Sequence, residues 1–284
     1  MKLVTFREGN TDRVGARSGD RIIDLSAGDP SIPSDMRSFL EAGDLARSAA
    51  ETVVSSENPS FSADSVQIRA PISNPEKIIC IGLNYADHAA ESGMDIPSEP
   101  IVFSKYASSI IGPGDTIKLP PTSSEPDYEA ELVVVIGKAG FNISETDAMA
   151  HVAGYTVGHD VSARDYQLKK PGGQWMMGKT FDTFAPIGPD LVTADEVTDP
   201  HNLAIKCILN GETVQDSNTA QLIFKVPQLI AYLSHVFTLR PGDLIFTGTP
   251  PGVGMARDPQ LWLKAGDHVV IEVEGLGRLE NSVA

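Results

Sequence analysis

The chain is poor in cysteine. Only Cys80 and Cys207 occur among its 284 residues, and two cysteines are too few for a disulfide framework. Each lies in an apolar run typical of a strand, KIICIG or AIKCIL, so we expect two buried free thiols. Free thiols suit a reducing compartment. We therefore expect a cytoplasmic protein, or a mitochondrial one if a transit peptide has been removed.

Basic residues are also scarce. The chain has 22 Lys and Arg residues against 38 Asp and Glu residues, which gives a formal net charge of −16. Nucleic acids and anionic membrane surfaces bind through positive charge, so we expect neither as a partner. No apolar run approaches the roughly 20 residues that a membrane-spanning helix needs. The N-terminal stretch MKLVTFREGNTDR lacks the apolar segment of a secretory signal.

Two common catalytic signatures are missing. The stretch FTGTPPGVG, residues 246–254, is a turn rich in Gly and Pro, but it lacks the Gly-Lys-Ser/Thr ending of a nucleotide-binding P-loop. It could still present backbone N–H groups and the hydroxyls of Thr247 and Thr249 to an anion. The chain also lacks the G-x-S-x-G elbow, which argues against a serine hydrolase of that kind.

Turn-forming residues are abundant by contrast. The 25 Gly and 20 Pro residues favour a strand-rich fold over a helical bundle. Residues 1–70 predict three short strands and two helices, with residues 55–65 as a polar linker. The remainder predicts strands with a few helices between them. We therefore expect an α+β, mostly β fold, with a small N-terminal α+β domain over residues 1–70 and a catalytic domain over residues 71–284.

Local signals place several elements. Ser34 is expected to cap a helix that ends near Gly43, and Asp44 to cap the next helix. The Ser-x-x-Asp start of SETDAMA, residues 144–150, predicts another helix. Asn210-Gly211 predicts a tight β-hairpin over residues 203–215. A helix is also expected over residues 226–237, where Pro227 lies in the first turn and apolar residues share one face.

Carboxylates gather before an apolar run in EPDYEAELVVVIGK, residues 125–138. Because side chains alternate across a strand, Glu129 and Glu131 should project from the same face. Asp160, at the end of another apolar strand, is the best third acid. Oxygen-only clusters suit hard cations such as Mg²⁺, Mn²⁺ or Ca²⁺. The alternatives are a solvated strand edge for the two glutamates and a turn or cap for the aspartate.

Other polar pairs have helical spacing. Arg164 and Gln167 lie three positions apart and could together bind a carboxylate or a keto oxygen; the alternative for Arg164 is a surface pair with Asp165. His88 and Glu91 have the same spacing, so the carboxylate could orient the imidazole and raise its basicity. The alternative is a solvent-exposed turn.

Lys179 lies in the apolar stretch MMGKTFDTFAP. A lysine drawn into the interior needs a partner, so an oxyanion or a substrate carboxylate is a plausible ligand for it. The alternative is a surface lysine that lays its aliphatic chain on apolar residues and keeps its ammonium group in water.

The order of the motifs resembles one family. Six motifs follow one another between residues 71 and 284. In chain order they are N-Y-x-D-H-x-x-E, F-x-K, D-Y-E-x-E-L, H-D-V-S-A-R-D-x-Q, G-K-x-F-D-T-F and L-x-P-G-D-x-I-x-T-G-T-P-x-G-V-G. Together they resemble the fumarylacetoacetate hydrolase superfamily. The resemblance implies a mixed β-sandwich roll with a small N-terminal domain, assembled as a homodimer.

The resemblance also implies roles for individual residues. Mg²⁺ or Mn²⁺ would be the cofactor, and Ca²⁺ could replace either in a crystal. A further aspartate that binds the metal in the founding hydrolase has no clear counterpart, so water is expected to complete the site, and Asp127 is left outside the ligand set. The implied residues are Glu129, Glu131 and Asp160 as metal ligands, His88 and Glu91 as a catalytic dyad on a mobile lid, Lys179 near the reacting carbonyl, and Arg164, Gln167 and Thr249 for the substrate carboxylate.

The implied substrate is a small 2-oxo acid, either a dicarboxylic acid or a diketo acid, that reacts through an enolate held on the metal. Keto–enol tautomerisation of oxaloacetate is the activity we expect. Hydrolysis of a C–C bond in an acylpyruvate or a diketo acid of the fumarylpyruvate type is the first alternative, and decarboxylation of oxaloacetate is another. A protein that binds metal without catalysis is a more distant one.

Overall fold

The computed structural model describes residues 1–56, 59–91, 93 and 95–284. Strands predominate over helices in this part of the chain, which confirms the expected α+β, mostly β fold. The large sheet has twelve strands in the order β4-β3-β2-β1-β13-β11-β10-β16-β6-β7, with β5 paired to β1 and β8 to β13. Its strands are β1 (Lys2–Glu8), β2 (Thr11–Ser18), β3 (Arg21–Asp24), β4 (Ser60–Ser62), β5 (Gln67–Arg69), β6 (Ile78–Gly82), β7 (Ile101–Lys105), β8 (Ile110–Ile111), β10 (Ala130–Ile136), β11 (Val152–His159), β13 (Ala185–Thr193) and β16 (Leu244–Phe246).

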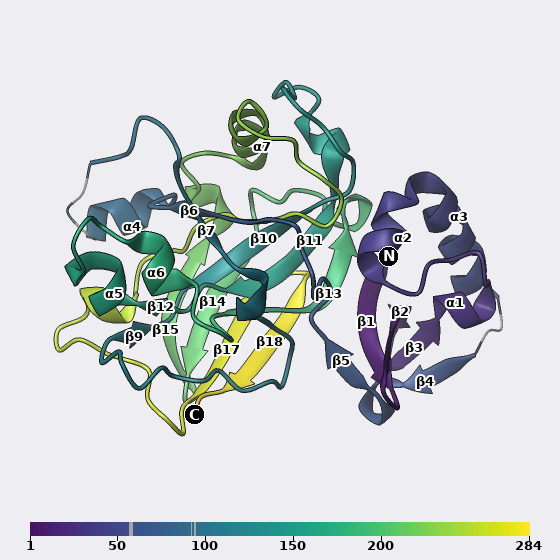
Figure 1. The fold of residues 1–284 in the computed structure, drawn as a ribbon, viewed down its shortest axis with the longest axis horizontal. Coiled ribbons are helices and arrows are strands. Elements are labelled where there is room, and N and C mark those ends of the chain that lie inside the picture. Colours follow the sequence, from purple (N-terminus) through teal and green to yellow (C-terminus); the bar gives the residue numbers. More distant parts are fainter. Residues whose placement is uncertain (57–58, 92, 94) are drawn as a thin grey trace.

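Two smaller sheets and seven α-helices complete the described fold (Figure 1). The four-stranded sheet contains β15 (Glu212–Asn218), β14 (Ala204–Leu209), β17 (His268–Val273) and β18 (Gly277–Ser282) in that order, and the two-stranded sheet pairs β12 (Ser162–Ala163) with β9 (Pro126–Asp127). The helices are α1 (Leu25–Gly28), α2 (Met36–Glu41), α3 (Gly43–Val54), α4 (Ala86–Glu91), α5 (Arg164–Lys169), α6 (Trp175–Lys179) and α7 (Val226–Ser234). None of the described helices combines the length and apolar character needed to cross a bilayer.

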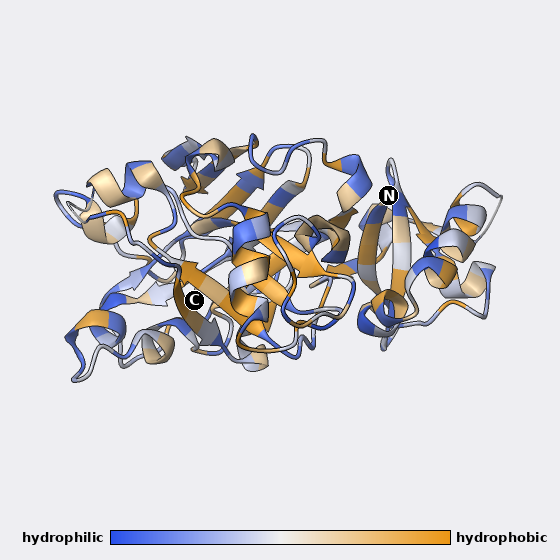
Figure 2. Cartoon of the chain, turned by 90° about the horizontal axis from the view of Figure 1, so that it is seen from above, coloured by the Kyte–Doolittle hydropathy of each residue, from blue (hydrophilic) through white to orange (hydrophobic). Residues whose placement is uncertain are grey.

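Strand β10 is buried on both faces, which explains its uninterrupted apolar sequence. Leu132 and Val134 point into the core shared with the four-stranded sheet. Val133 and Val135 point the other way, into a core that continues to α2 and α3. Figure 2 shows apolar residues concentrated along these central strands. All four of these residues are fully buried, so β10 is a firm base for Glu129, which precedes the strand, and for Glu131 within it.

The N-terminal segment joins the rest of the fold through backbone hydrogen bonds. Strand β1 pairs with β13, with Lys2 opposite Val192, so the large sheet runs from the N-terminal strands into the body of the molecule. The expected linker over residues 55–65 contains β4, which pairs with β3; Glu57 and Asn58 of that linker lie outside the described residues. The division into domains at residue 70 stays a prediction.

Several local expectations are confirmed and others need correction. The Asn210-Gly211 hairpin forms between β14 and β15, and α7 has Pro in its first turn. The cap of α2 is Asp35, not Ser34, because the Asp35 carboxylate accepts the N–H of Ser38 at 2.9 Å. The second expected helix, α3, begins at Gly43, one residue before its predicted cap.

The prediction of a helix over residues 144–150 is wrong. Only a short 3-10 helix, Ala148–His151, forms there. Ser144 and Asp147 bond to each other at 2.7 Å through their side chains, which stabilises a turn that the Ser-x-x-Asp pattern specifies equally well. Both expected free thiols are confirmed, because Cys80 and Cys207 are buried and unbridged.

Candidate active site

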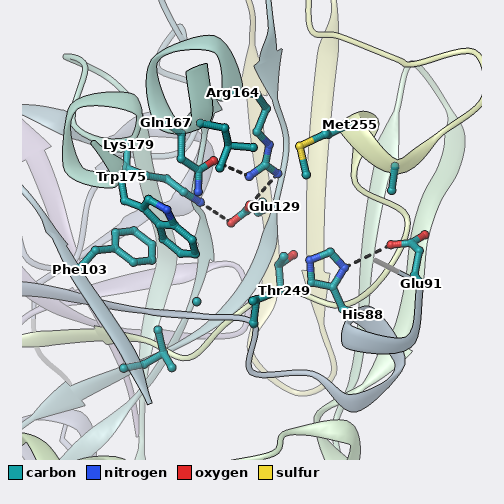
Figure 3. Close-up of a pocket in the computed structure, with 15 residues that line it drawn as sticks. His88, Glu91, Phe103, Glu129, Arg164, Gln167, Trp175, Lys179, Thr249 and Met255 are labelled. Carbon is teal, nitrogen blue, oxygen red and sulfur yellow. Dashed lines mark hydrogen bonds and ion pairs between the residues drawn. The ribbon is translucent and has the colours of Figure 1, made fainter. Parts of the chain in front are cut away.

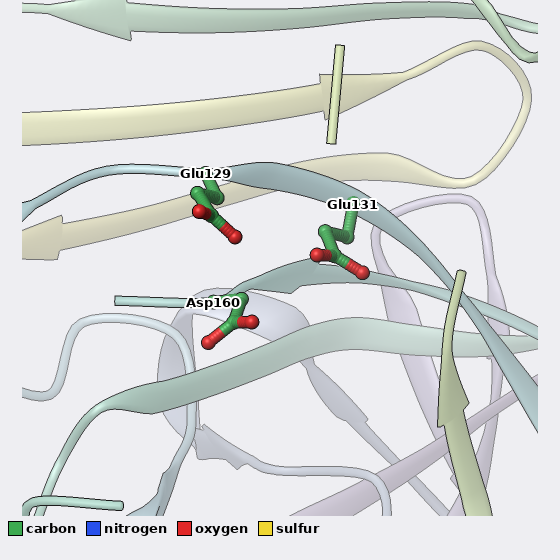
Figure 4. A group of neighbouring side chains, drawn as sticks. All are labelled: Glu129, Glu131 and Asp160. Carbon is green, nitrogen blue, oxygen red and sulfur yellow. The ribbon is translucent and has the colours of Figure 1, made fainter. Parts of the chain in front are cut away.

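Antiparallel pairing of β10 with β11 brings the three predicted metal ligands together. Ala130 lies opposite His159, so Glu129 and Asp160 adjoin across the ladder, and the Asp160 N–H donates to the Glu129 carbonyl at 3.0 Å. Glu131 is two residues beyond Glu129 and shares its face. Ligand oxygens of Glu129, Glu131 and Asp160 lie within 4.8 Å of one another, and all three residues are buried (Figure 4). A solvated strand edge is therefore the wrong interpretation.

Two of these carboxylates are paired with cations. Glu129 contacts Lys179 at 2.7 Å and Arg164 at 2.7 Å. Asp160 contacts Lys179 at 2.9 Å and Lys105 at 2.6 Å. Burial by itself would raise the pKa of Glu129, but the charges of Lys179 and Arg164 outweigh it and hold that pKa below its usual range. Glu129 is thus kept ionised, as a metal ligand must be.

Glu131 differs from its neighbours, because the described structure gives it no cationic partner. One of its oxygens accepts the N–H of Gly248 at 2.8 Å. Burial, followed by the negative charges of Asp160 and Glu129, raises its pKa well above the usual value. A buried carboxylate beside two others is costly unless positive charge compensates it.

With all of its carboxylates ionised, as metal binding requires, the site has an excess of one buried negative charge. Its carboxylates are Asp127, Glu129, Glu131 and Asp160, and its cations are Lys105, Arg164 and Lys179. A divalent cation would turn this excess into a net positive charge, which suits an anionic substrate. Three converging carboxylates are also the donors that Mg²⁺ and Mn²⁺ prefer. The residues present therefore fit a divalent metal site.

A cavity of about 400 Å³ opens over Glu129 and collects the predicted catalytic and substrate-binding residues. Figure 3 shows them converging from α4, α5, α6 and the turn after β16. Glu131 and Asp160 lie behind this lining. The predicted residues that line the cavity are His88, Glu91, Glu129, Arg164, Gln167, Lys179 and Thr249.

His88 and Glu91 form the expected contact on α4. The His88 Nδ1 atom lies 3.2 Å from a Glu91 carboxylate oxygen. His88 is buried, so a solvent-exposed turn is wrong for the histidine, whereas Glu91 is exposed. Glu91 also accepts the N–H of Gly252 at 3.0 Å. Asp87 accepts the Ser217 hydroxyl at 2.6 Å, which ties α4 to the four-stranded sheet. Whether this helix acts as a lid stays a prediction.

Asn84 lies two residues before α4, where the sequence N-Y-x-D-H would allow it to cap the helix, but its side chain bonds to other segments. Its side-chain oxygen accepts the N–H of Phe224 at 2.8 Å, and its amide donates to the carbonyl of Thr247 at 2.8 Å. Asn84 instead links the start of α4 to the approach of α7 and the end of β16. Ser92 and Met94, which follow the helix, lie outside the described residues.

Arg164 is engaged inside the site. Its Nε donates to Asp127 at 2.8 Å and its Nη1 donates to the Gln167 side-chain oxygen at 2.9 Å. The surface pair with Asp165 does not form, because Asp165 accepts the Ser123 hydroxyl instead. Burial would lower the pKa of Arg164, but Asp127 and Glu129 raise it. The guanidinium therefore aligns Gln167 and Glu129, and its contact with substrate stays a prediction.

Lys179 is a buried residue, so the surface interpretation is wrong for it. Burial alone would lower its pKa, but Asp160 and Glu129 raise it, so the ammonium is charged. An ammonium has three N–H donors, and two of them serve Glu129 and Asp160. The Lys179 nitrogen also lies 5.1 Å from the centre of the Phe103 ring. One donor remains for a substrate oxygen in the cavity.

Two structurally important residues, Lys105 and Gln215, are not among the predicted site residues. Lys105, the lysine of F-x-K, donates to the carbonyls of Val161 at 3.0 Å and Phe184 at 2.8 Å, and also to that of Lys179. Its position in an apolar strand is a signal that it is buried. It fixes the backbone on both sides of the site.

Gln215 gives no such signal, because it is one of several polar residues in β15. Its side-chain oxygen accepts the N–H of Ala130, the residue between Glu129 and Glu131, at 2.9 Å. Its amide donates to the Thr249 hydroxyl at 2.9 Å and to the Pro250 carbonyl at 2.8 Å. Because the Thr249 oxygen accepts this bond, the hydroxyl proton is free to point elsewhere.

Comparison with known proteins agrees with this geometry. Residues 77–284 match the family model described as fumarylacetoacetate (FAA) hydrolase, C-terminal. The whole chain is 54% identical over 287 residues to the mitochondrial oxaloacetate tautomerase fahd2 of Xenopus laevis and covers 90% of that protein. The chain belongs to the fumarylacetoacetate hydrolase family. Two segments, FSKYASSIIGPGD and GKTFDTFAPIGPDLVT, predict a particular resemblance to fumarylacetoacetate hydrolase domain-containing protein 2. The identity to the Xenopus laevis fahd2 protein confirms this resemblance.

Solved structures of the fumarylacetoacetate hydrolase family share the fold. A fumarylacetoacetate hydrolase from Exiguobacterium antarcticum superposes with a TM-score of 0.86 at 33% identity, covering 100% of this chain and 99% of the other. A maleylpyruvate hydrolase from Sphingobium sp., in complex with manganese(II) and pyruvate, has a TM-score of 0.85 at 30% identity and the same coverage. The mixed β-sandwich roll expected for this family is thereby confirmed.

Proposed function

We propose that this protein is a divalent-metal-dependent keto–enol tautomerase that acts on oxaloacetate. The observation that carries the proposal is the cavity lined by His88, Glu91 and Lys179, whose wall also includes Glu129 of the buried carboxylate triad. The oxaloacetate tautomerase of Xenopus laevis, 54% identical over its matched length, supports the substrate. Structures of the family at 30% to 33% identity carry the names of hydrolases, which makes C–C bond hydrolysis of an acylpyruvate the second candidate.

The metal would be held by Glu129, Glu131 and Asp160. Mg²⁺ or Mn²⁺ bound there would supply a Lewis acid that favours negative charge on the 2-oxo acid. The manganese(II) and pyruvate in the maleylpyruvate hydrolase structure support this type of ion. Glu131, whose charge has no partner in the described residues, would gain most from the ion.

His88 is the residue that moves the proton. In the keto-to-enol direction it takes a proton from C3 of the substrate, and the C2 oxygen ends up protonated; the reverse direction returns the proton to C3. Glu91 orients the imidazole, with its carboxylate oxygen 3.2 Å from the His88 Nδ1 atom. The free N–H of Lys179 would stabilise the charge that develops on the C2 oxygen. Gln167, Thr249 and Arg164 would hold the substrate carboxylate in place.

One assay separates the possible reactions. Enol-oxaloacetate is added to the protein with Mg²⁺, and its ultraviolet absorption is followed while pyruvate and CO₂ are measured in the same sample. We expect the absorption to fall faster than without protein, with no pyruvate and no CO₂. Release of CO₂ would identify a decarboxylase instead. Cleavage of acetylpyruvate in a parallel sample, with no effect on enol-oxaloacetate, would identify a hydrolase.

Replacing His88 with Ala should lower the tautomerisation rate by roughly 10²- to 10⁴-fold, because a positioned general base contributes about that much. Binding of Mn²⁺ should survive, since His88 is not among the proposed ligands. The measurement is the initial rate with enol-oxaloacetate alongside a Mn²⁺ titration. His268→Ala, at a half-exposed histidine that pairs with Glu280 away from the cavity, is the control and should keep the full rate. An unchanged rate in His88→Ala would remove the dyad from the mechanism.

We further propose that the protein is a homodimer with a small N-terminal domain, residues 1–70, and a catalytic domain, residues 71–284. The family resemblance supports the dimer. The Xenopus laevis relative is named as mitochondrial, which supports the same compartment here if a transit peptide precedes the chain, and the cytoplasm otherwise. Light scattering of the purified protein would measure the mass of the assembly directly.

A further inference from the structure

One wall of the cavity is apolar and aromatic. Phe103 and Trp175 pack edge to face, with ring centres 5.7 Å apart and planes at 66°, and both line the cavity. In the view of Figure 3 they lie on one side of Glu129, while His88 lies on the other. The reacting centre is therefore bounded by the proton-moving residue on one side and by two rings on the other.

This wall is built into the fold. The Trp175 ring lies against the backbone of Gly82 at the end of β6, where a Cβ atom would come within 2.4 Å of the ring. A larger residue at position 82 would displace the indole, so glycine permits the close approach. Phe103 projects from β7, the neighbour of β6 in the sheet. Strand β7 thus carries Phe103, while Trp175, the first residue of α6, packs against the neighbouring strand β6.

Among the described residues, no permanently charged cation of the cavity lining is free to pair with a carboxylate at the distal end of a substrate that reaches this wall. Among them, the permanently charged cations of the cavity lining are Arg164 and Lys179. Arg164 pairs with Asp127 and Glu129, and Lys179 pairs with Glu129 and Asp160. The cavity, at about 400 Å³, has room for a group larger than the short arm of oxaloacetate. An uncharged ring fits this surface better than a second carboxylate does.

We propose that the same site also tautomerises arylpyruvates, which are 2-oxo acids with an aromatic ring on C3, and that the ring rests against Phe103 and Trp175. The inference deepens the proposed function, because it uses the same metal site and the same proton transfer. His88 removes a proton from C3, and the C2 oxygen is protonated as the double bond moves. No atom is gained or lost and nothing is oxidised, so no co-reactant is needed.

The test uses the full-length protein with Mg²⁺ and the enol form of phenylpyruvate, whose ketonisation is followed by ultraviolet absorption. We expect the protein to accelerate this reaction above the rate in buffer, and chelation of the metal to remove the acceleration. In Trp175→Ala, kcat/KM for enol-phenylpyruvate should fall about tenfold relative to kcat/KM for enol-oxaloacetate, since an aromatic contact contributes on that order. Phe141→Ala, at an exposed phenylalanine outside the cavity, should leave the ratio unchanged.

The outcomes separate this inference from the proposed function. Activity with enol-oxaloacetate but none with enol-phenylpyruvate would overturn the inference alone. Inactivity with both would overturn the proposed function as well. An equal fall with both substrates in Trp175→Ala would show that the wall does not recognise the ring. If Trp175→Ala fails to fold, Phe103→Leu tests the other ring by the same ratio, kcat/KM for enol-phenylpyruvate over kcat/KM for enol-oxaloacetate. An unchanged ratio in Phe103→Leu would also overturn the inference.

Discussion

Glu131→Gln is expected to abolish the stabilisation of the protein by Mn²⁺ without destabilising the metal-free form. Its amide oxygen can still accept the N–H of Gly248, which lies 2.8 Å from the carboxylate. The neutral amide also avoids the burial cost and the repulsion by Asp160 and Glu129 that raise the pKa of Glu131. Metal affinity should fall at least about 100-fold, because even residues that only support a ligand contribute about 10- to 100-fold.

Thermal unfolding with and without Mn²⁺ measures both effects. Wild-type protein at an ion concentration of about 100 times the dissociation constant should gain about 2.7 kcal/mol of unfolding free energy. Glu131→Gln should gain almost none. Asp190→Asn is the matched control, since Asp190 is a buried carboxylate paired with Arg17 away from the cavity; it should lower the stability of the metal-free protein and keep the Mn²⁺ response. A full Mn²⁺ response in Glu131→Gln would exclude the proposed metal site.

Lys105→Met should destabilise the fold by about 3–5 kcal/mol, the range for removing one partner of a buried ion pair. The substitution leaves Asp160 without one of its ammonium partners. It also removes the donor for the carbonyls of Val161, Lys179 and Phe184. Methionine fills a similar volume, so the loss would come from unpaired polar groups and not from a cavity.

Urea denaturation, analysed for the free energy of unfolding, measures the effect. Lys206→Met is the control, because Lys206 forms a half-exposed pair with Asp216 at 3.2 Å, and such surface pairs contribute at most about 1 kcal/mol. A loss smaller than about 1 kcal/mol in Lys105→Met would mean that water replaces the ammonium, and that Lys105 does not hold the site together.

Strand periodicity is enough to predict part of the site. The two-residue spacing of Glu129 and Glu131 places both carboxylates on one face of a strand, and the apolar run after them indicates burial. Asp160 is harder to predict, since its approach to Glu129 depends on the register of β10 with β11. Its position at the end of an apolar strand makes Asp160 a candidate for the third acid. The order of motifs in the family resemblance then implies that it joins the two glutamates.

Other features depend on tertiary contacts that no local pattern reveals. Lys105 takes its three carbonyl partners from positions 161, 179 and 184, and Gln215 reaches the ligand strand from the four-stranded sheet. Asn84 matches a helix cap locally, yet its amide group bonds to segments more than a hundred residues away. Polar residues that serve long-range contacts resemble ordinary surface residues in sequence.

The pairing of β1 with β13 has a practical consequence for truncated forms. Lys2 and Leu3 cover the backbone of Val192 and Leu191. A fragment that starts at residue 71 would lose this cover and leave N–H and C=O groups of β13 without partners. Uncovered strand edges of this kind recruit other chains and promote aggregation. The N-terminal strands thus cover a strand edge that would otherwise be open to other chains, although none of their residues lines the cavity.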